Sequence, residues 1–469
     1  MRTISLLNLL SQAELTSLGK YLKSPFFTEK PYLHSLFDKL RQAGQSVAEW
    51  PDYRRARLFP KGTFTGKKWN NALSDLNACI EEFLVVNHLL ADRDLYNQAL
   101  VKAYSERLND PVLQRSVSTI IERVSGKEAP EQMDTWHLRF WSRKRALTHP
   151  LTNRIKLGVA TIDALEQDLD TYYYISKTQL MCNRVSGIKL FGWPTEQDAP
   201  MQWLETVRRA ANENPSPLLK VYCDLLGLLL GAGVDLPAFF TTLRHHAPRL
   251  HRDELQDIVR MAFNACIYRQ RKGEKGTFDW HLAIYNWSIG QGLGAGPQAE
   301  EEYLNIGVLL AKSHRHAEFE NHMNVGKEII PADRLEQAKT LLKACWEFSQ
   351  GNYSDAQVKI SQITSRHLRY TLSRHSLAVR NSYMLFLDGA INLSVVKHAL
   401  DSFDEFLKNK SLFSDSFRQS HQGLIWFVRE FIQPDTVQKK SKKYLLQEIN
   451  IRQPANSDWV MAVLDRLPD

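Results

Sequence analysis

The sequence predicts an all-α protein that contains an irregular α-α superhelix of antiparallel helical hairpins. Three observations support this fold class. Apolar residues recur at helical spacing through most of the chain, residues 338–363 read as two helices with a tight turn between them, and no stretch sustains the alternating β-branched pattern of several strands. At 469 residues, the chain is long enough for a large core or for two to three domains.

The composition is that of a soluble globular protein, with 43% hydrophobic and 24% charged residues. No run of about 18 apolar residues suggests a membrane-spanning helix. The five cysteines lie far apart and form no C-x-x-C pair, so we expect reduced and mostly buried thiols and a cytoplasmic location. The net charge of +8 is a mild bias that allows an acidic partner.

The N-terminal region is predicted to hold a series of amphipathic helices. Ser11 and Glu14 have the spacing of a capping box, in which each side chain satisfies a free backbone N–H at a helix start. Apolar residues at helical spacing follow over residues 33–40 and 69–84. Further helices are expected over about residues 91–107 and 111–125.

The segment Ser-Gly-Lys-Glu-Ala-Pro-Glu-Gln, residues 125–132, is the best linker candidate in the first third of the chain. We therefore divide the chain into an N-terminal helical region, residues 1–127, and a helical-repeat superhelix, residues 128–469.

A weak internal period runs through the second region. Its seven anchor residues are separated by 41, 41, 43, 40, 39 and 39 residues: Trp141, Cys182, Cys223, Cys266, Ile306, Cys345 and Met384. A glycine or polar break follows most of them: Gly187, Gly227, Gly273, Ser313, Gly351 and Gly389. A period near 40 suits one hairpin of two helices of about four turns each with two loops.

The clearest hairpin covers residues 338–363. Its first helix has an apolar face and is expected to stop at Gly351 and Asn352. Ser354 and Gln357 have capping-box spacing, which predicts the start of the second helix, whose apolar face is Ala356, Ile360 and Ile363. Two amphipathic helices cannot bury both faces alone, so this unit needs neighbours of its own kind.

The residues Gly351, Tyr353, Ala356 and Ile360 resemble the turn and second helix of a tetratricopeptide repeat. In that family the glycine closes the first helix, the tyrosine packs across the hairpin and the small alanine lets the helices approach. Residues 303–319 resemble a more degenerate copy that lacks the Gly-x-Tyr turn, and the other hairpins exceed the 34 residues of that repeat. The resemblance implies a TPR-like solenoid for residues 128–469.

The whole chain also resembles a group of uncharacterised bacterial helical-repeat proteins. The similarity is carried by residues 10–37, 58–60 and 402–408. It implies an α-solenoid and carries no known activity.

No pattern predicts a catalytic, cofactor-binding or metal-binding residue. The glycine-rich segment 290–297 invites a phosphate-loop interpretation, but no strand precedes it and no Gly-Lys-Ser/Thr closes it, so we expect an inter-helix loop. Histidines gather at residues 245–251 and at His314, His316 and His322, without an i, i+4 pair or a nearby cysteine, and we expect them on the surface or in loops. G-x-S-x-G and H-E-x-x-H are both absent.

Basic stretches are the most suggestive functional signal. Residues 139–145 mix cations and aromatics, as surfaces that bind single-stranded nucleic acid do. Helical spacing places Trp141 in the core and leaves a solvated basic face, or alternatively a face whose contacts to phosphate or to an acidic partner come from Arg139, Arg143, Lys144 and Arg145. Further basic residues are Arg54, Arg55, Arg57, Lys67, Lys68, Lys439, Lys440, Lys442 and Lys443.

Superhelices of this kind present a concave face that holds peptides or other proteins. By analogy with that fold class we expect a non-catalytic scaffold that binds a protein or peptide, without a cofactor and without a membrane. The alternative is a nucleic-acid-binding helical-repeat protein, which would gather Lys and Arg on one concave surface and lose affinity steeply with salt. An enzyme ranks third, because it needs a deep pocket lined by several titratable groups. The sequence does not specify the partner-binding residues or the oligomeric state.

Overall fold

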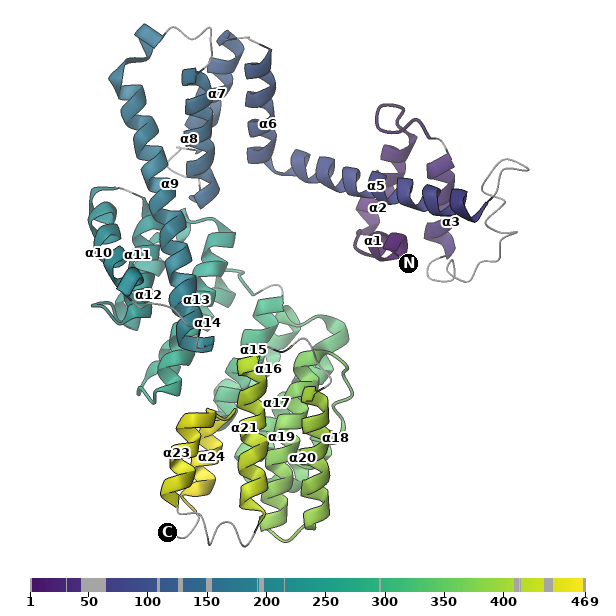
Figure 1. Cartoon of the computed structure of the whole chain (residues 1–469), viewed down its shortest axis with the longest axis vertical. Coiled ribbons are helices and arrows are strands. Elements are labelled where there is room, and N and C mark those ends of the chain that lie inside the picture. The colour runs from purple at the N-terminus through teal and green to yellow at the C-terminus, as the bar shows by residue number, and fades with distance from the viewer. Residues whose placement is uncertain are drawn as a thin grey trace. The chain divides into compact units, whose positions relative to one another are not determined.

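The chain is helical throughout the part that the structure describes. A computed structural model describes residues 2–30, 32–43, 65–107, 110–124, 130–148, 154–191, 193, 198–214, 216–294, 297–408, 413, 415–433 and 442–466. Within these residues it holds 22 α-helices, one 3-10 turn and no strand, which confirms the predicted all-α class (Figure 1). No helix among them is both long and apolar enough to cross a membrane.

Contacts divide the chain into two compact units. The first contains Met1–Gly126 and His137–Asp168, and the second contains Lys127–Trp136 and Leu169–Asp469. The first unit is built from α1 Arg2–Asn8, α2 Gln12–Lys23, α3 Tyr32–Ala43, α5 Gly66–Ala91, α6 Arg93–Glu106 and α7 Asp110–Val124. Two helices, α8 Met133–Thr148 and α9 Arg154–Phe191, contribute residues to both units.

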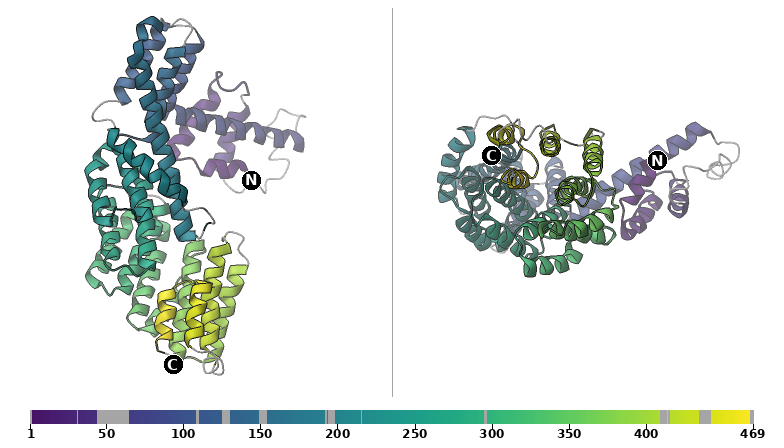
Figure 2. Two further views of the ribbon diagram at one scale, coloured as in Figure 1. Left: turned by 60° about the vertical axis from the view of Figure 1, so that its left-hand side comes forward. Right: turned by 90° about the horizontal axis from the view of Figure 1, so that it is seen from below.

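The second unit continues with helices that pack in sequence order. These are α10 Asp198–Glu213, α11 Pro217–Leu230, α12 Leu236–His246, α13 Arg252–Arg271, α14 Thr277–Gly290, α15 Pro297–Lys312, α16 His316–Ile329, α17 Ala332–Ser349, α18 Tyr353–Ser361, α19 Leu368–Leu387, α20 Leu393–Lys408, α21 Asp415–Phe431, α23 Lys442–Arg452 and α24 Ser457–Leu464, with the 3-10 turn Ala247–Arg249 after α12. Seen from below, successive hairpins of this unit follow a curved path (Figure 2).

The N-terminal helices of the first unit enclose one apolar core. Leu18, Leu22, Leu33 and Ile80 are almost fully buried there. The predicted capping box starts α2: Ser11 Oγ accepts the Glu14 N–H at 3.3 Å, and the Glu14 carboxylate accepts the Ser11 N–H at 2.8 Å. A second core forms between α6, α7 and α8, and Trp141 packs partly buried against it, as its helical spacing predicts. Residues 58–60, which carry part of the resemblance to the bacterial helical-repeat proteins, lie outside the described residues.

The internal period picks out alternate helices of the second unit. Its anchors from Cys182 to Met384 lie on α9, α11, α13, α15, α17 and α19. These are the first helices of successive hairpins, and α11 packs on α13, α15 on α17, and α17 on α19. Trp141 does not belong to the series, because it lies on α8 within the residues of the first unit. The arrangement is compatible with a helical-repeat solenoid.

The glycines that follow the anchor residues mark the end of a helix in some hairpins but not in others. Gly273, Gly351 and Gly389 have φ angles of 75°, 83° and 71°, a left-handed conformation that glycine adopts without steric cost. Gly227 instead lies inside α11, which runs on to Leu230 and ends at Gly231 with a φ of 73°. Gly187 likewise lies inside α9. Those two sequence breaks were wrong, because tertiary packing tolerates glycine within a long helix.

The predicted hairpin of residues 338–363 forms as α17 and α18. Ala356 is fully buried and Ile360 is 4% exposed, and the Tyr353 ring lies 5.6 Å from the Phe348 ring across the turn. The N–H of Asn352 donates to the carbonyl of Glu347 at 2.9 Å, which closes α17 over Gly351. The predicted capping box at Ser354 was wrong: the N-cap of α18 is Asn352, two residues earlier, and it makes no side-chain capping bond.

The described end of the predicted linker is fastened to the second unit. Residues 125–129 lie outside the described residues, but Glu131 donates its N–H to the Arg249 carbonyl at 2.6 Å and accepts the His251 N–H at 2.9 Å. Its carboxylate accepts Ser216 Oγ at 2.5 Å at the start of α11. Burial raises the pKa of Glu131 in spite of these bonds. Residues 130–132 are therefore a docked segment. The chain passes from the first unit to the second at residue 127, next to the predicted boundary, returns to the first unit at residue 137, and enters the second again at residue 169.

Substituting Gly351→Ala should destabilise the hairpin. An alanine Cβ meets no atom within 4 Å at this position, so the cost is the left-handed φ itself, about 1 kcal/mol of unfolding free energy. Gly290→Ala is the matched control, because Gly290 also faces open space but has no positive φ. We expect urea unfolding to have a lower midpoint for Gly351→Ala and an unchanged or higher one for Gly290→Ala. Equal shifts in both variants would contradict this account.

The His375 imidazole should make stability depend on pH. Burial, with a smaller effect of Arg374, lowers the pKa of His375 from 6.5 to about 4, and its ring stacks 4.9 Å from that of Phe406. Between pH 6.5 and 4, His375 is therefore protonated in the unfolded chain but stays neutral in the folded chain. The folded state loses stability as the pH falls through that window. His375→Phe keeps the stacking and removes the titration.

We expect the variant to gain stability relative to the native chain by roughly 1–3 kcal/mol as the pH falls from 7 to 4. Thermal unfolding of both proteins across this range measures the difference. A difference that does not change with pH would contradict the assignment.

Candidate functional site

The first helices of the last hairpins and the C-terminal helix enclose a cavity of about 300 Å³. Its size lies at the lower end of the range for small-ligand pockets. The apolar lining comes from Val308, Cys345, Phe348, Tyr353, Leu377, Met384, Trp459, Ala462 and Val463. The polar lining comes from Lys312, His314, Ser349, Arg380, Asp458 and Arg466. The cavity thus has an apolar wall and a strongly cationic remainder.

The helices position these side chains through local sequence. α15, α17 and α19 lie side by side, so each presents one face to the cavity. Before α24, the Asn456 amide donates to Ser376 Oγ of α19 at 3.1 Å. The Trp459 ring then meets the Tyr383 ring edge-on at 5.8 Å. These contacts hold α24 against α19 and make it the last wall of the cavity.

An ion pair links α15 to α24. The Lys312 ammonium at the end of α15 lies 2.6 Å from the Asp458 carboxylate at the start of α24. Burial alone would raise the pKa of Asp458, but the charge and hydrogen bond of Lys312 and the backbone N–H of Trp459 outweigh it and lower the pKa. Asp458 is therefore ionised at neutral pH, and Lys312 and Asp458 neutralise each other.

Arg380 is the unusual residue of the site. Its side chain is 8% exposed, and it makes one hydrogen bond, from Nε to the Ser376 carbonyl at 3.2 Å. Its guanidinium carbon lies 5.1 Å from the centre of the Phe348 ring. It forms no ion pair with any carboxylate among the residues that the structure describes. Burial lowers the pKa of Arg380, opposed at longer range by Cys345 and Asp458, yet a guanidinium stays protonated at neutral pH.

The charge balance of the cavity favours an anion. Arg380 and Arg466 remain as positive charges once Lys312 and Asp458 have neutralised each other, and Arg466 also makes no ion pair within the described residues. A buried charge without a partner is costly, so the site is better satisfied when an anion occupies it.

The lining groups give little basis for covalent chemistry. Burial raises the pKa of the Cys345 thiol, which therefore holds little of the reactive thiolate at neutral pH. The His314 ring nitrogen Nδ1 is engaged with the Gln350 side chain at 2.8 Å. The arrangement is suited to binding an apolar group that carries a negative charge.

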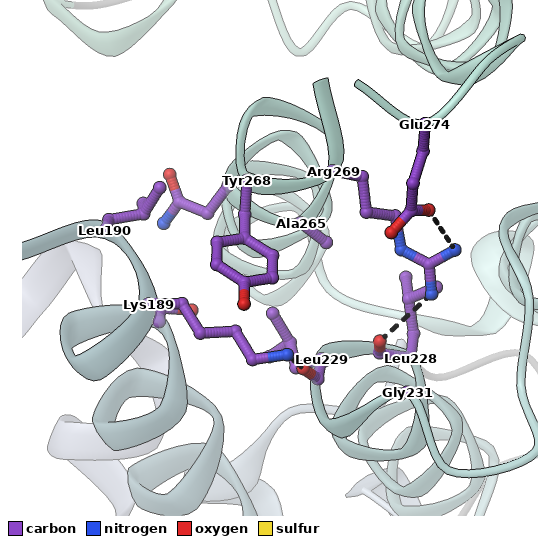
Figure 3. Close-up of a pocket in the computed structure, with 11 residues that line it drawn as sticks. Lys189, Leu190, Leu228, Leu229, Gly231, Ala265, Tyr268, Arg269 and Glu274 are labelled. Atoms are coloured by element: carbon purple, nitrogen blue, oxygen red, sulfur yellow. Dashed lines mark hydrogen bonds and ion pairs between the residues drawn. The ribbon is translucent and has the colours of Figure 1, made fainter. Parts of the chain in front are cut away.

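A second and smaller cavity of about 70 Å³ lies between α9, α11 and α13 (Figure 3). Its polar groups serve the helix ends: Lys189 donates to the carbonyl of Leu229, and Arg269 donates to that of Leu228 at 3.4 Å and pairs with Glu274 at 3.6 Å. These bonds satisfy free carbonyls at the end of α11. The space left over has room for a few water molecules.

The basic segment 139–145 is split between a buried ion cluster and the surface. Arg139 lies 2.9 Å from the fully buried Asp168 carboxylate of α9, and Arg143 contacts its other oxygen. Burial raises the pKa of Asp168, although both arginines oppose it. Lys144 and Arg145 are exposed, over the rings of Phe140 and Trp141. Only two of the four predicted contact residues therefore face solvent.

Other basic residues are dispersed. Lys67 and Lys68 lie exposed at the start of α5, and Lys443 lies exposed on α23. The predicted basic residues Arg54, Arg55, Arg57, Lys439 and Lys440 lie outside the described residues.

The glycine-rich segment and the clustered histidines form no recognisable binding site within the described residues. A helix, α14, precedes the glycine-rich segment 290–297, whose residues 295–296 lie outside the described residues. His322 was expected on the surface or in a loop, and this was wrong: it is buried within α16, its Nε2 lies 2.8 Å from the Tyr303 carbonyl, and its ring stacks on Tyr303 at 4.2 Å. Burial lowers the pKa of His322 to about 4. No group of three or more His, Cys, Asp or Glu side chains in the described ranges is placed to hold a metal.

Comparison with known proteins adds no relative. No family model matches the chain, and neither the curated proteins nor the solved structures contain a match.

Sequence reasoning missed the cavity residues, although one of them leaves a readable trace. Arg380 lies three residues after Leu377 and four before Met384, so it interrupts the apolar face of a predicted helix. A cation on such a face signals either a buried pair or a ligand. Lys312 and Asp458 are 146 positions apart, and only the fold brings them together.

Substituting Asp168→Asn should destabilise the first unit strongly, because Arg139 and Arg143 would keep their positions without a countercharge. We expect a loss of about 3 kcal/mol in unfolding free energy. Arg145→Gln, on the exposed face of the same segment, should cost less than about 1 kcal/mol. Urea unfolding followed by circular dichroism compares the two, and an Asp168→Asn variant as stable as Arg145→Gln would refute the buried cluster.

Proposed function

We propose that this chain is a non-catalytic scaffold that binds a protein or peptide partner at the cavity between α15, α17, α19 and α24. The observation that carries the proposal is the cavity of about 300 Å³ with an apolar wall beside the buried guanidinium of Arg380. Peptide-binding grooves in helical proteins combine apolar pockets with a few polar groups that fix orientation.

The chain's own C-terminal helix supports this assignment. α24 lies against α21, and an acidic residue, Asp458, and an aromatic one, Trp459, line the cavity from this helix. A surface that accepts an acidic and aromatic helix of its own chain has the chemistry to accept a similar segment from a partner.

We also infer that α17 and α18 form a TPR-like hairpin in a cytoplasmic protein. The left-handed Gly351, the Tyr353–Phe348 ring contact and the buried Ala356 support the resemblance to that repeat. Tyr353 also lines the cavity, so the turn of this hairpin belongs to the proposed binding surface.

The alternative function, nucleic-acid binding, has a different location. It would use Lys144 and Arg145 on the first unit, where both side chains are exposed beside aromatic rings. Such binding would weaken steeply with salt, since phosphate contacts release counterions. Arg139 and Arg143 support it less, because both are engaged with Asp168.

Photo-cross-linking tests the proposed surface directly. With p-benzoylphenylalanine in place of Tyr353, we expect one discrete protein adduct from native lysate that nuclease does not remove. Val358 provides the matched control on the same short helix, because its side chain is 56% exposed while Tyr353 is directed at the cavity. The probe at position 358 should give no such adduct.

Two outcomes would contradict the proposal. Equal adducts from positions 353 and 358 would show that the cavity is not the contact surface. Adducts that disappear with nuclease, and that also diminish in a Lys144→Gln/Arg145→Gln chain, would favour nucleic-acid binding.

A further inference from the structure

The guanidinium of Arg380 is the only buried cation among the residues that line the cavity. Its exposed fraction is 8%, its Nε is used by the Ser376 carbonyl, and its remaining N–H groups have no hydrogen bond to a described residue. The same side chain lines a space of about 300 Å³. A ligand oxygen placed there would meet donors that no group of the described residues already uses.

We propose that Arg380 anchors a monoanionic carboxylate group carried on an apolar body. A guanidinium offers two parallel N–H groups that match the two oxygens of a carboxylate. The apolar body would lie against Phe348, Met384 and Trp459, which line the same cavity. The proposal rests on the proposed function in one respect, namely that this cavity is a binding site.

The single buried positive charge of the cavity favours a carboxylate over a more highly charged group. Lys312 is already held by Asp458 at 2.6 Å, so Arg380 is the only buried cation that is left for a ligand among the lining residues. Arg466, at the rim, is exposed and adds long-range attraction more than a fixed contact. One buried positive charge is best balanced by one negative charge.

The ion pair of Lys312 and Asp458 sharpens the selection. Because the two charges neutralise each other, this side of the cavity offers no countercharge to a second acidic group of a ligand. The ligand class is therefore an aromatic or aliphatic group with one carboxylate. Its source is either an acidic side chain next to apolar residues in a partner peptide or a free small carboxylic acid.

The test compares matched probes by isothermal titration calorimetry on the full chain. 4-Phenylbutyrate carries the expected carboxylate, and 4-phenylbutanamide is its neutral isostere. We expect the acid to bind at least tenfold more tightly than the amide. The preference should vanish in Arg380→Gln and persist in part in Arg380→Lys, while Arg145→Gln, on the first unit, should leave it unchanged.

A second pair of probes identifies the source of the carboxylate. These are a capped pentapeptide with one glutamate between two phenylalanines and the same peptide with glutamine. If the glutamate peptide shows the Arg380-dependent preference and competes with 4-phenylbutyrate, the carboxylate is a peptide side chain. If only 4-phenylbutyrate shows it, the ligand is a small acid, and the subsite assignment stands in both cases.

The proposal is overturned if acid and amide bind the native chain equally, if neither of them binds, or if the preference survives in Arg380→Gln. Far-ultraviolet circular dichroism and thermal unfolding establish that each variant is folded before it is titrated. The photo-cross-link from position 353 separates this inference from the proposed function. An adduct that persists in Arg380→Gln, together with no carboxylate preference, would leave the scaffold in place and remove Arg380 as its anchor.

Discussion

The close packing of the first helices of successive hairpins is the constraint on which the rest of the second unit depends. α15 lies on α17 and α17 on α19, and the approach leaves no space for side chains at particular positions. A Cβ on Gly307 of α15 would lie 2.6 Å from Leu342 of α17, and one on Gly326 of α16 would lie 2.5 Å from the Tyr303 hydroxyl. Interiors packed this tightly transmit small changes instead of absorbing them. The helices therefore hold Lys312, Cys345 and Arg380 in fixed relation, and the cavity is a product of the hairpin packing.

Buried arginines have different surroundings in the two units. In the first unit, Arg139 and Arg143 converge on Asp168, and the positive charges are met within the protein. In the second unit, Lys312 forms an ion pair with Asp458, but Arg380 lies beside an aromatic ring and the cavity. Charged side chains in protein interiors are almost always paired, so Arg380 is the position where a bound anion would stabilise the protein most.

The fold was largely predictable from the sequence because helical periodicity is a local signal. The Ser11 capping box and the helix end at Gly351 depend on residues within a few turns, as does the apolar spacing of each helix in the period from Cys182 onward. The errors arose where tertiary contacts decide: Gly227 stays within α11, His322 is buried against Tyr303, and Glu131 docks on Arg249 and His251. The site was beyond reach for the same reason, since its walls come from positions 308 to 466.

Hydrogen exchange of backbone amides, with and without 4-phenylbutyrate, tests the central claim that the cavity around Arg380 is a ligand site. The account predicts slower exchange confined to α17, α19 and α24, because a bound carboxylate would tie the buried guanidinium to the walls that these helices supply. Protection of the first unit alone, or no change anywhere at a saturating concentration, would contradict it.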